Sequence, residues 1–248
     1  MSFDYSLIPN GYYDNVLSGP DGMRKFWHYH KFESVLRYIP ENLIGLDKNI
    51  LDIGCFAGSF LGMIPPEMFS YQIGVDILPG QIEYATQKYG TKYRIFRSFS
   101  DDLNLSNEFK GHFHVITLIE VIEHLNVEQI LKLLTQISEL LHPEGKLIIT
   151  TPNYCSTWPL LEFLINHFSD IQYEEQHLTK FNYFMLEPKV KNLVGNLALN
   201  CEAKTTTHFL SPFVAAISYK MATQMATKIP SAYWSNPFGN IILSRWSK

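Results

Sequence analysis

Two stretches of the sequence bring acidic and imidazole side chains together at spacings that could support proton transfer. Glu120, Glu123 and His124 stand within IEVIEHL, and His177 stands within the later stretch EEQHLTKFN. An imidazole changes its charge near neutral pH, so either histidine could act as the general base for an acceptor hydroxyl. Each stretch follows a predicted strand, and we therefore expect His124 and His177 to face one another across a single site. The Glu-His pair could equally serve only to organise its loop.

The stretch LDIGCFAGSF, at residues 51–60, has the glycine spacing of a ligand-binding turn that follows a strand. A dinucleotide-binding turn has the pattern G-x-G-x-x-G, but here Phe56 replaces the middle glycine between Gly54 and Gly58, and no third glycine follows at the required offset. Asp52 would repel a pyrophosphate, whereas it would attract a ligand with an ammonium or sulfonium charge. The turn therefore predicts a ligand with an ammonium or sulfonium charge rather than a dinucleotide.

The elements that must position these residues alternate between strands and helices. Short runs rich in Ile and Val predict strands at KNILDIG, YQIGVDI, YRIFRSF, HFHVITLIE and GKLIITTP. Between them, PGQIEYATQKYG and NVEQILKLLTQISELLHPEG predict helices. This alternation is typical of a doubly wound, Rossmann-like α/β fold with helices on both faces of a parallel sheet. Ligands bind at the C-terminal ends of such strands, where Asp76 in GVDIL could accept hydrogen bonds from both hydroxyls of a ribose.

The flanking segments predict further helices and a final strand pair. An apolar face over residues 22–38 predicts an N-terminal helix, and CEAKTTTHFLS with NIILSRWSK predicts two paired strands. One amphipathic helix is predicted over 212–229, where apolar residues recur every four positions at Phe213, Ile217, Met221, Met225 and Ile229. That helix could pack on the sheet, form a lid or a dimer face, or contact a lipid-linked acceptor, although Lys220 and Lys228 are few cations for a membrane surface.

The composition narrows the classes of partner and compartment. The chain has 248 residues, a formal net charge of −4 and a pI near 6.1. It lacks the basic balance of nucleic-acid-binding proteins, so we expect no nucleic-acid partner. Its three widely spaced cysteines predict neither a disulfide framework nor a cysteine metal site, which fits a cytoplasmic protein. The N-terminus does not resemble a secretory signal, and no apolar run has the length of a membrane-spanning helix.

Four stretches resemble, in order and spacing, the successive motifs of class I S-adenosylmethionine-dependent methyltransferases, especially the small-molecule group: LDIGCFAGSF, GVDIL, FHVITLIEVIEHL and LHPEGKLIITTPN. The resemblance spans roughly residues 45–185. It implies a seven-stranded sheet whose last strand is antiparallel. It also implies S-adenosyl-L-methionine as the cofactor, S-adenosyl-L-homocysteine as the product, and a small-molecule or glycan-type acceptor, which we expect to be methylated at oxygen.

The same resemblance assigns residues to the cofactor. Gly54 and Gly58 would let the backbone approach its methionine part, Asp76 would hold its ribose, and Ser100 and Asp101 would meet its adenine. The candidate cofactor-binding residues are Asp52, Gly54, Cys55, Phe56, Gly58, Asp76, Ile77, Ser100, Asp101, Ile119 and Glu120. Acceptor selection would fall to residues 212–229 and to Tyr12, Tyr13, Trp27, His28, His30, Asn153, Tyr154 and Trp158.

We expect a single domain with three parts, acting as a monomer or a homodimer. Residues 1–40 would form an N-terminal helical cap, and residues 45–152 a cofactor-binding core. Residues 153–248 would supply the acceptor-side helices and the final strand pair.

Two alternatives keep this fold but change the function. Glu120, Glu123, His124 and His177 resemble the divalent-metal site of small-RNA 3′-terminal 2′-O-methyltransferases, in which the ion grips the hydroxyls of a terminal ribose. In our main interpretation these residues hold no metal, and His124 and His177 are catalytic. The other alternative is a non-catalytic subunit that binds the cofactor only for stability.

Overall fold

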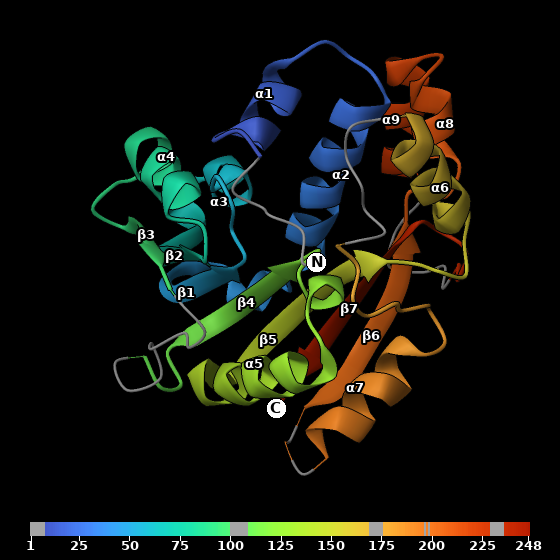
Figure 1. Cartoon of the computed structure of the whole chain (residues 1–248). Helices are drawn as coiled ribbons and strands as arrows, with labels where there is room; N and C mark the ends of the chain where they lie inside the picture. Colours follow the sequence, from blue (N-terminus) through green and yellow to red (C-terminus); the bar gives the residue numbers. More distant parts are fainter. Residues whose placement is uncertain (1–7, 100–108, 169–175, 196, 198, 229–235) are drawn as a thin grey trace.

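A single mixed sheet organises the chain (Figure 1). The structure, a computed structural model, describes residues 8–99, 109–168, 176–195, 197, 199–228 and 236–248. Within these residues the strands are β1 (Gly45–Ile53), β2 (Phe69–Asp76), β3 (Arg94–Ser98), β4 (Phe113–Ile119), β5 (Leu141–Pro152), β6 (Asn200–Thr207) and β7 (Ile241–Ser247). Their order is β3-β2-β1-β4-β5-β7-β6; β1 to β5 pair in parallel, and β7 is antiparallel to β5 and β6. The predicted seven-stranded Rossmann-like sheet with an antiparallel last strand is confirmed.

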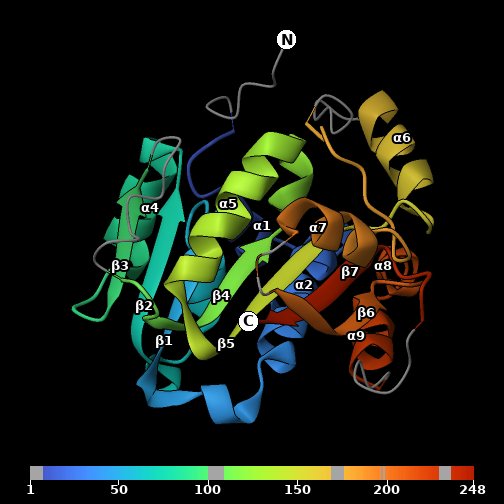
Figure 2. The same cartoon turned by 90° about the horizontal axis from the view of Figure 1, so that it is seen from below.

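Helices cover both faces of this sheet. They are α1 (Tyr12–Ser18), α2 (Met23–Tyr38), α3 (Ser59–Met63), α4 (Pro79–Tyr89), α5 (Val127–Leu140), α6 (Trp158–Phe168), α7 (Leu186–Val194), α8 (Ser211–Ala215) and α9 (Tyr219–Lys228). Side chains of α5 and α7 pack against one face, and those of α2, α3 and α4 pack against the other. Figure 2, seen from below, shows α5 and α7 in front of the strands. None of the described helices is long and apolar enough to cross a membrane.

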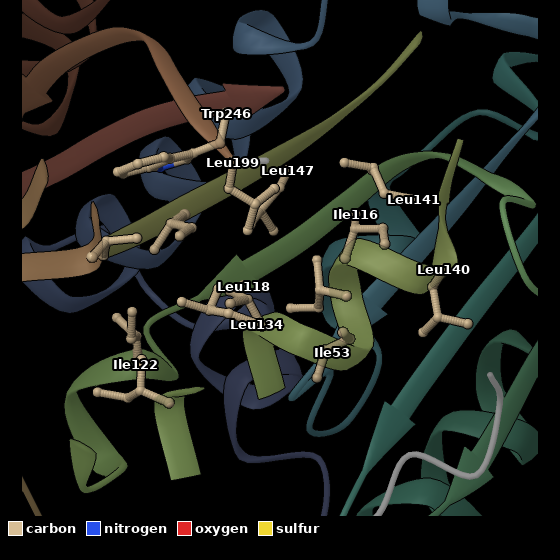
Figure 3. Close-up of a cluster of buried hydrophobic side chains, with 14 of the residues drawn as sticks. Ile53, Ile116, Leu118, Ile122, Leu134, Leu140, Leu141, Leu147, Leu199 and Trp246 are labelled. Carbon is tan, nitrogen blue, oxygen red and sulfur yellow. The ribbon is translucent and has the colours of Figure 1, made fainter. Parts of the chain in front are cut away.

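The central strands are apolar on both sides because both faces of the sheet are covered. Along β1, Leu51 and Ile53 point into the core beneath α5 and α7, whereas Ile50, which precedes them, points into the core beneath α2 and α3. Figure 3 shows the first of these cores, in which Ile53 and Leu118 of the strands lie beside Leu134 of α5. Continuous burial of this kind explains why the strands appear in the sequence as unbroken Ile and Val runs.

The start of α5 is fixed by its own sequence. Asn126 accepts a hydrogen bond from the Gln129 amide at 3.0 Å, and the Gln129 side chain accepts one from the Asn126 amide at 2.9 Å. This reciprocal cap satisfies two amides that the helix leaves without a partner. Ile130, Leu134 and Ile137 then recur on the buried face. The cap fixes where the segment between β4 and α5, which carries Glu120 to His124, must end.

The prediction of one helix over 212–229 was wrong. The chain forms α8 and α9, with a break at residues 216–218, and Ile217 within that break is 90% exposed. Small residues make the contacts instead: Ala215 and Ala222 are buried against Phe26 of α2. A spacing of four residues drifts around a helix of 3.6 residues per turn, so the apolar stripe could not face one partner along its whole length.

Candidate functional site

A cavity of about 900 Å³ opens at the C-terminal ends of β1, β2 and β4. Its floor is formed by the segments that follow these strands, around Gly54, Ile77 and Glu120. The residues of α1, α2 and α6 that line it include Tyr13, Trp27 and Trp158. This is the edge at which doubly wound sheets bind their ligands. The volume is sufficient for a nucleoside ligand together with a second, small molecule.

The turn after β1 holds three residues in left-handed backbone conformations, with φ values of +75° at Gly54, +48° at Phe56 and +72° at Gly58. A Cβ atom at Gly54 would lie 2.4 Å from a methyl of Val121, and one at Gly58 would lie 2.7 Å from the Phe96 ring. Both glycines are therefore required by packing and by φ. Gly54 lines the cavity, whereas Gly58 is not among the described residues that line it.

Two buried carboxylates lie beside this turn. Asp76 accepts hydrogen bonds from the amides of Phe56 at 2.8 Å and Leu78 at 2.9 Å, one on each oxygen. Asp52 accepts a hydrogen bond from the Thr117 hydroxyl at 2.6 Å. Burial, with a further contribution from the charge of Asp76, raises the pKa of Asp52 to about 7, and burial also raises the pKa of Asp76. Each carboxylate would be stabilised in its ionised form by a cationic or hydroxyl-bearing ligand.

The remaining predicted cofactor residues differ in what they offer. Ile77 is 57% exposed and lines the cavity, as do Phe56 and Ile119. Cys55 also borders the cavity, but its side chain is buried in the core and burial raises the pKa of its thiol, which makes it unreactive. Ser100 and Asp101 lie outside the described residues, and their neighbour Phe99 lines the cavity.

Helix α2 forms one wall of the cavity and contacts the sheet through an ion pair. Lys31, buried on α2, is paired with Glu120, which follows β4 and has a φ of +54°. Tyr13 of α1 packs against His28 and Phe56, with ring centroids 4.5 and 5.0 Å apart. Glu120, which we predicted to bind the cofactor, lines the cavity, and its carboxylate is paired with Lys31.

Three of the residues in the predicted acid-histidine group lie together. Glu123, His124 and His177 each offer a ligand atom, and these atoms all lie within 4.8 Å of one another. One oxygen of the buried Glu123 accepts a hydrogen bond from Thr151 at 3.0 Å, and its other oxygen, Oε1, has no hydrogen-bond partner within the described part of the chain. Burial, reinforced by the charge of Glu120, raises the pKa of Glu123.

The two histidines face one another, with ring centroids 5.1 Å apart. His124 Nδ1 lies 3.0 Å from the Gln176 carbonyl, so Nδ1 carries the proton, and burial lowers the pKa of His124 to about 4. A neutral ring with a proton on Nδ1 presents the lone pair of Nε2. The expectation that both histidines line a single site therefore agrees with the geometry, and both line the cavity.

A carboxylate that sequence reasoning missed holds His177. Glu162 of α6 lies 2.7 Å from His177 Nδ1, and it also accepts a hydrogen bond from the Tyr154 hydroxyl at 2.7 Å. Burial opposes ionisation of Glu162, but these two hydrogen bonds outweigh it and lower its pKa. The sequence did contain a signal for this carboxylate, because Glu162 is the one charged residue in the apolar stretch WPLLEFLINHF. A carboxylate that is buried with such a stretch needs a partner.

The predicted acceptor-selecting residues divide into two groups. Tyr12, Tyr13, Trp27, His28 and Trp158 line the cavity, and Trp27 lies 5.3 Å from Trp158 between ring centroids. The others have structural partners. His30 is bonded to Glu33 at 2.8 Å, and Asn153 donates hydrogen bonds to the Pro237 and Gly239 carbonyls.

The sheet order, the glycine turn and the acidic residue at the end of β2 together define a class I methyltransferase fold. A family model described as a methyltransferase domain matches residues 23–193, and the chain belongs to this family. None of the curated proteins matches the chain.

Many solved structures share the fold. A SAM-dependent methyltransferase from Archaeoglobus fulgidus is 19% identical, with 99% of this chain and 100% of that chain covered and a TM-score of 0.58. The geranyl diphosphate C-methyltransferase from Streptomyces coelicolor A3(2), in complex with Mg²⁺, geranyl diphosphate and S-adenosyl-L-homocysteine, is 13% identical over 99% and 88% of the two chains, with a TM-score of 0.60. The N-methyltransferase NodS from Bradyrhizobium japonicum WM9, in complex with S-adenosyl-L-homocysteine, is 17% identical over 94% and 95%, with a TM-score of 0.55.

The methyl donor of this family is S-adenosylmethionine, and the cavity has the groups that this cofactor needs. Asp52 and Asp76 offer buried carboxylates for its cationic and hydroxyl groups. Gly54 brings its backbone to the cavity, and the buried Ser59, whose hydroxyl has no hydrogen-bond partner among the described residues, also lines the cavity. Only one of the three descriptions names an acceptor, geranyl diphosphate, so these structures share the fold with this chain and leave its acceptor undetermined.

Proposed function

We propose that this methyltransferase acts on an oxygen of a small-molecule or glycan-type acceptor, with His177 as the general base. The observation that carries the proposal is the hydrogen bond between Glu162 and His177 Nδ1 in the wall of the cavity. A carboxylate on Nδ1 fixes the tautomer of the ring, so that Nε2 presents a lone pair to a proton donor.

The donor supplies a methyl group on a positively charged sulfur, which is already activated for displacement. The task of the protein is to hold both reactants in line and to manage one proton. We assign the donor to the end of the cavity with Asp52, Gly54, Phe56 and Asp76. The carboxylate of the donor requires a cation. Lys31 lies beside this end of the cavity, with its ammonium 5.7 Å from the centroid of the Tyr13 ring, which packs on Phe56.

At the other end of the cavity, His177 would take the acceptor hydroxyl proton onto Nε2 as the oxygen attacks. Glu162, held ionised by its two hydrogen bonds, would stabilise the resulting imidazolium through Nδ1–H. His124 would remain neutral beside it, because burial keeps its pKa low. The low pKa of His124 means that its imidazolium would be poorly stabilised, so we assign the general base to His177 rather than to His124.

The test combines turnover with cofactor binding. Purified protein is incubated with S-adenosylmethionine and a panel of hydroxylated small molecules and glycans, and formation of S-adenosylhomocysteine is measured. His177→Ala should lower turnover of every accepted substrate and leave affinity for S-adenosylhomocysteine nearly unchanged. Unaltered turnover would remove His177 from the mechanism, and any turnover by the wild type excludes the non-catalytic subunit.

A second candidate function is favoured by the orphaned Glu123 oxygen. Glu123, His124 and His177 could hold a divalent ion that grips the hydroxyls of a terminal ribose, as in the RNA methyltransferase alternative. Glu162 on His177 and the Gln176 carbonyl on His124 would then orient the ligand nitrogens. Glu120, the fourth ligand in that alternative, is paired with Lys31 instead.

Metal content separates the two candidates. If the second candidate holds, purified protein retains a divalent ion that Glu123→Gln abolishes, and a chelator stops methylation of RNA 3′ ends. Methylation of small acceptors that continues in the presence of a chelator, with no transfer to RNA, would exclude it.

A further inference from the structure

The cavity-facing side of α2 carries a row of basic residues. Arg24, His28 and Lys31 are spaced at i, i+4 and i+7, and all three line the cavity. Residues seven apart share a face of a helix and lie about 10 Å apart along its axis, at 1.5 Å per residue. Figure 1 shows the last turns of α2 near the sheet and its first turns away from it. Arg24 therefore lies toward the outer part of the cavity, and Lys31 lies deeper.

The cations of α2 differ in how their charges are compensated. Lys31 is paired with Glu120, Lys25 with Asp21 and Arg37 with Glu33. Arg24 has no ion pair, and its guanidinium has no hydrogen bond, among the residues that the structure describes. Its side chain is exposed, and it lines the cavity. A guanidinium on a cavity wall that has no anionic partner in the described part of the chain is available to bind an anionic ligand.

Aromatic rings connect the level of Arg24 to His177. Trp27, one turn along α2 from Arg24, lies 5.3 Å from Trp158, and Trp158 lies 6.1 Å from His177, both measured between ring centroids. None of the described carboxylates that line the cavity forms an ion pair with Arg24. An acceptor that reaches His177 from the outer part of the cavity would pass these rings and leave its far end beside the guanidinium.

We propose that the acceptor carries an anionic group, a carboxylate or a phosphate, which Arg24 binds while the indoles of Trp27 and Trp158 contact its apolar body. A planar guanidinium matches either anion through two parallel hydrogen bonds. The assignment rests on the proposed function, because it takes His177 as the position of the reacting hydroxyl. We assign the carboxylate of the donor to the deeper level, where Lys31 lies in its ion pair with Glu120.

The experiment measures binding of simple aromatic probes to protein saturated with S-adenosylhomocysteine, through the fluorescence of the cavity tryptophans and by calorimetry. The probes are 2-naphthoate, 2-naphthyl phosphate and the uncharged 2-naphthamide. They are compared on the wild type, Arg24→Gln, Arg24→Lys and Arg37→Gln. Arg37→Gln is the matched control, because it removes the same charge from an exposed position of the same helix.

We expect the wild type and Arg37→Gln to prefer an anionic probe over the amide by about tenfold or more, the scale of one charge-assisted contact. The anionic probe that binds more tightly, the carboxylate or the phosphate, would indicate which anionic group the acceptor carries. Arg24→Gln should remove the preference and Arg24→Lys should keep part of it, with affinity for S-adenosylhomocysteine unchanged in all variants.

The inference would be overturned if the wild type bound the two acids and the amide with equal affinity, or bound none of them. It would also be overturned if the preference for an anionic probe persisted in Arg24→Gln. A tenfold loss of S-adenosylhomocysteine affinity in Arg24→Gln would likewise overturn it, because Arg24 would then bind the donor. If instead the wild type fails to bind S-adenosylhomocysteine, the proposed function itself fails.

Discussion

The two ends of the cavity are built in different ways. At the donor end, Asp52, Gly54, Phe56 and Asp76 come from two short stretches, and their key contacts are hydrogen bonds to backbone amides and glycine conformations. At the acceptor end, side chains meet from α2, α6 and two loops that are distant in the sequence. The donor end is therefore specified by local backbone geometry, whereas the acceptor end depends on how separate elements pack.

The electrostatics of the two ends differ in the same way. The carboxylates of the donor end, Asp52 and Asp76, are buried and their pKa values are raised, so a cationic ligand would stabilise their ionised forms. At the acceptor end, the carboxylate of Glu162 already has a protein partner in His177. The donor end therefore suits a positively charged ligand, whereas the acceptor end suits proton transfer to a histidine.

The largest expected effect concerns Glu162. Glu162→Gln should lower turnover by roughly 10²–10⁴-fold, the range of general acid–base catalysis, because His177 loses the charge that stabilises its protonated ring. Tyr154→Phe keeps the carboxylate and should cost far less. Steady-state rates at saturating donor measure both, and equal losses in the two variants would indicate a purely structural network.

Gly54→Ala tests the backbone requirement of the donor end. A Cβ there combines a φ of +75° with a contact of 2.4 Å to Val121, so we expect a loss of roughly 2–5 kcal/mol in the free energy of unfolding. Gly111→Ala is the matched control, because Gly111 has a φ of +66° but an added Cβ would have no neighbouring atom of the described residues within 4 Å. Its loss should be about 1–2 kcal/mol. Urea unfolding of both variants measures the difference, and equal losses would contradict the assigned clash.

Asp76→Asn should weaken S-adenosylhomocysteine binding by about 10–100-fold, through the loss of charge-assisted hydrogen bonds to the ribose. Asp47→Asn, at an exposed position near the start of β1, is the control and should change nothing. Calorimetry measures both affinities. Wild-type affinity in Asp76→Asn would remove this carboxylate from the donor site.

Donor affinity should depend on pH through Asp52. Its pKa of about 7 in the free protein should fall when a cationic ligand binds, so binding below pH 7 must release a proton. Affinity should therefore rise about tenfold from pH 6 to pH 8 and then level off. Asp52→Asn should bind more weakly at pH 8 and show a flatter profile. A flat wild-type profile, or an equal slope in the variant, would assign the titration elsewhere.

The smallest effect is expected for Phe56→Gly. Glycine adopts the φ of +48° without strain, and the Phe56 amide that bonds Asp76 is retained, so donor affinity should stay within about threefold of the wild type. The lost contact with Tyr13 should appear mainly in stability. A tenfold loss of affinity would make the Phe56 ring part of the donor site.

The same contrast explains what the sequence could and could not reveal. Strands buried on both faces, the glycine turn and Asp76 were all predictable, because each leaves a local pattern of residue types. Glu162 lies 15 residues from His177, and Lys31 lies 89 residues from Glu120, so only the packed fold brings these partners together. The apolar stripe over 212–229 led to the wrong prediction of one helix, because the residues that contact α2 are the small Ala215 and Ala222.

The most direct test of a donor end separate from an acceptor end is a calorimetric titration of S-adenosylhomocysteine into the wild type, Asp76→Asn and His177→Ala at pH 8. We predict binding to the wild type, a loss of about 10–100-fold in Asp76→Asn and no change in His177→Ala. Failure of the wild type to bind, or an equal loss in both variants, would contradict the account.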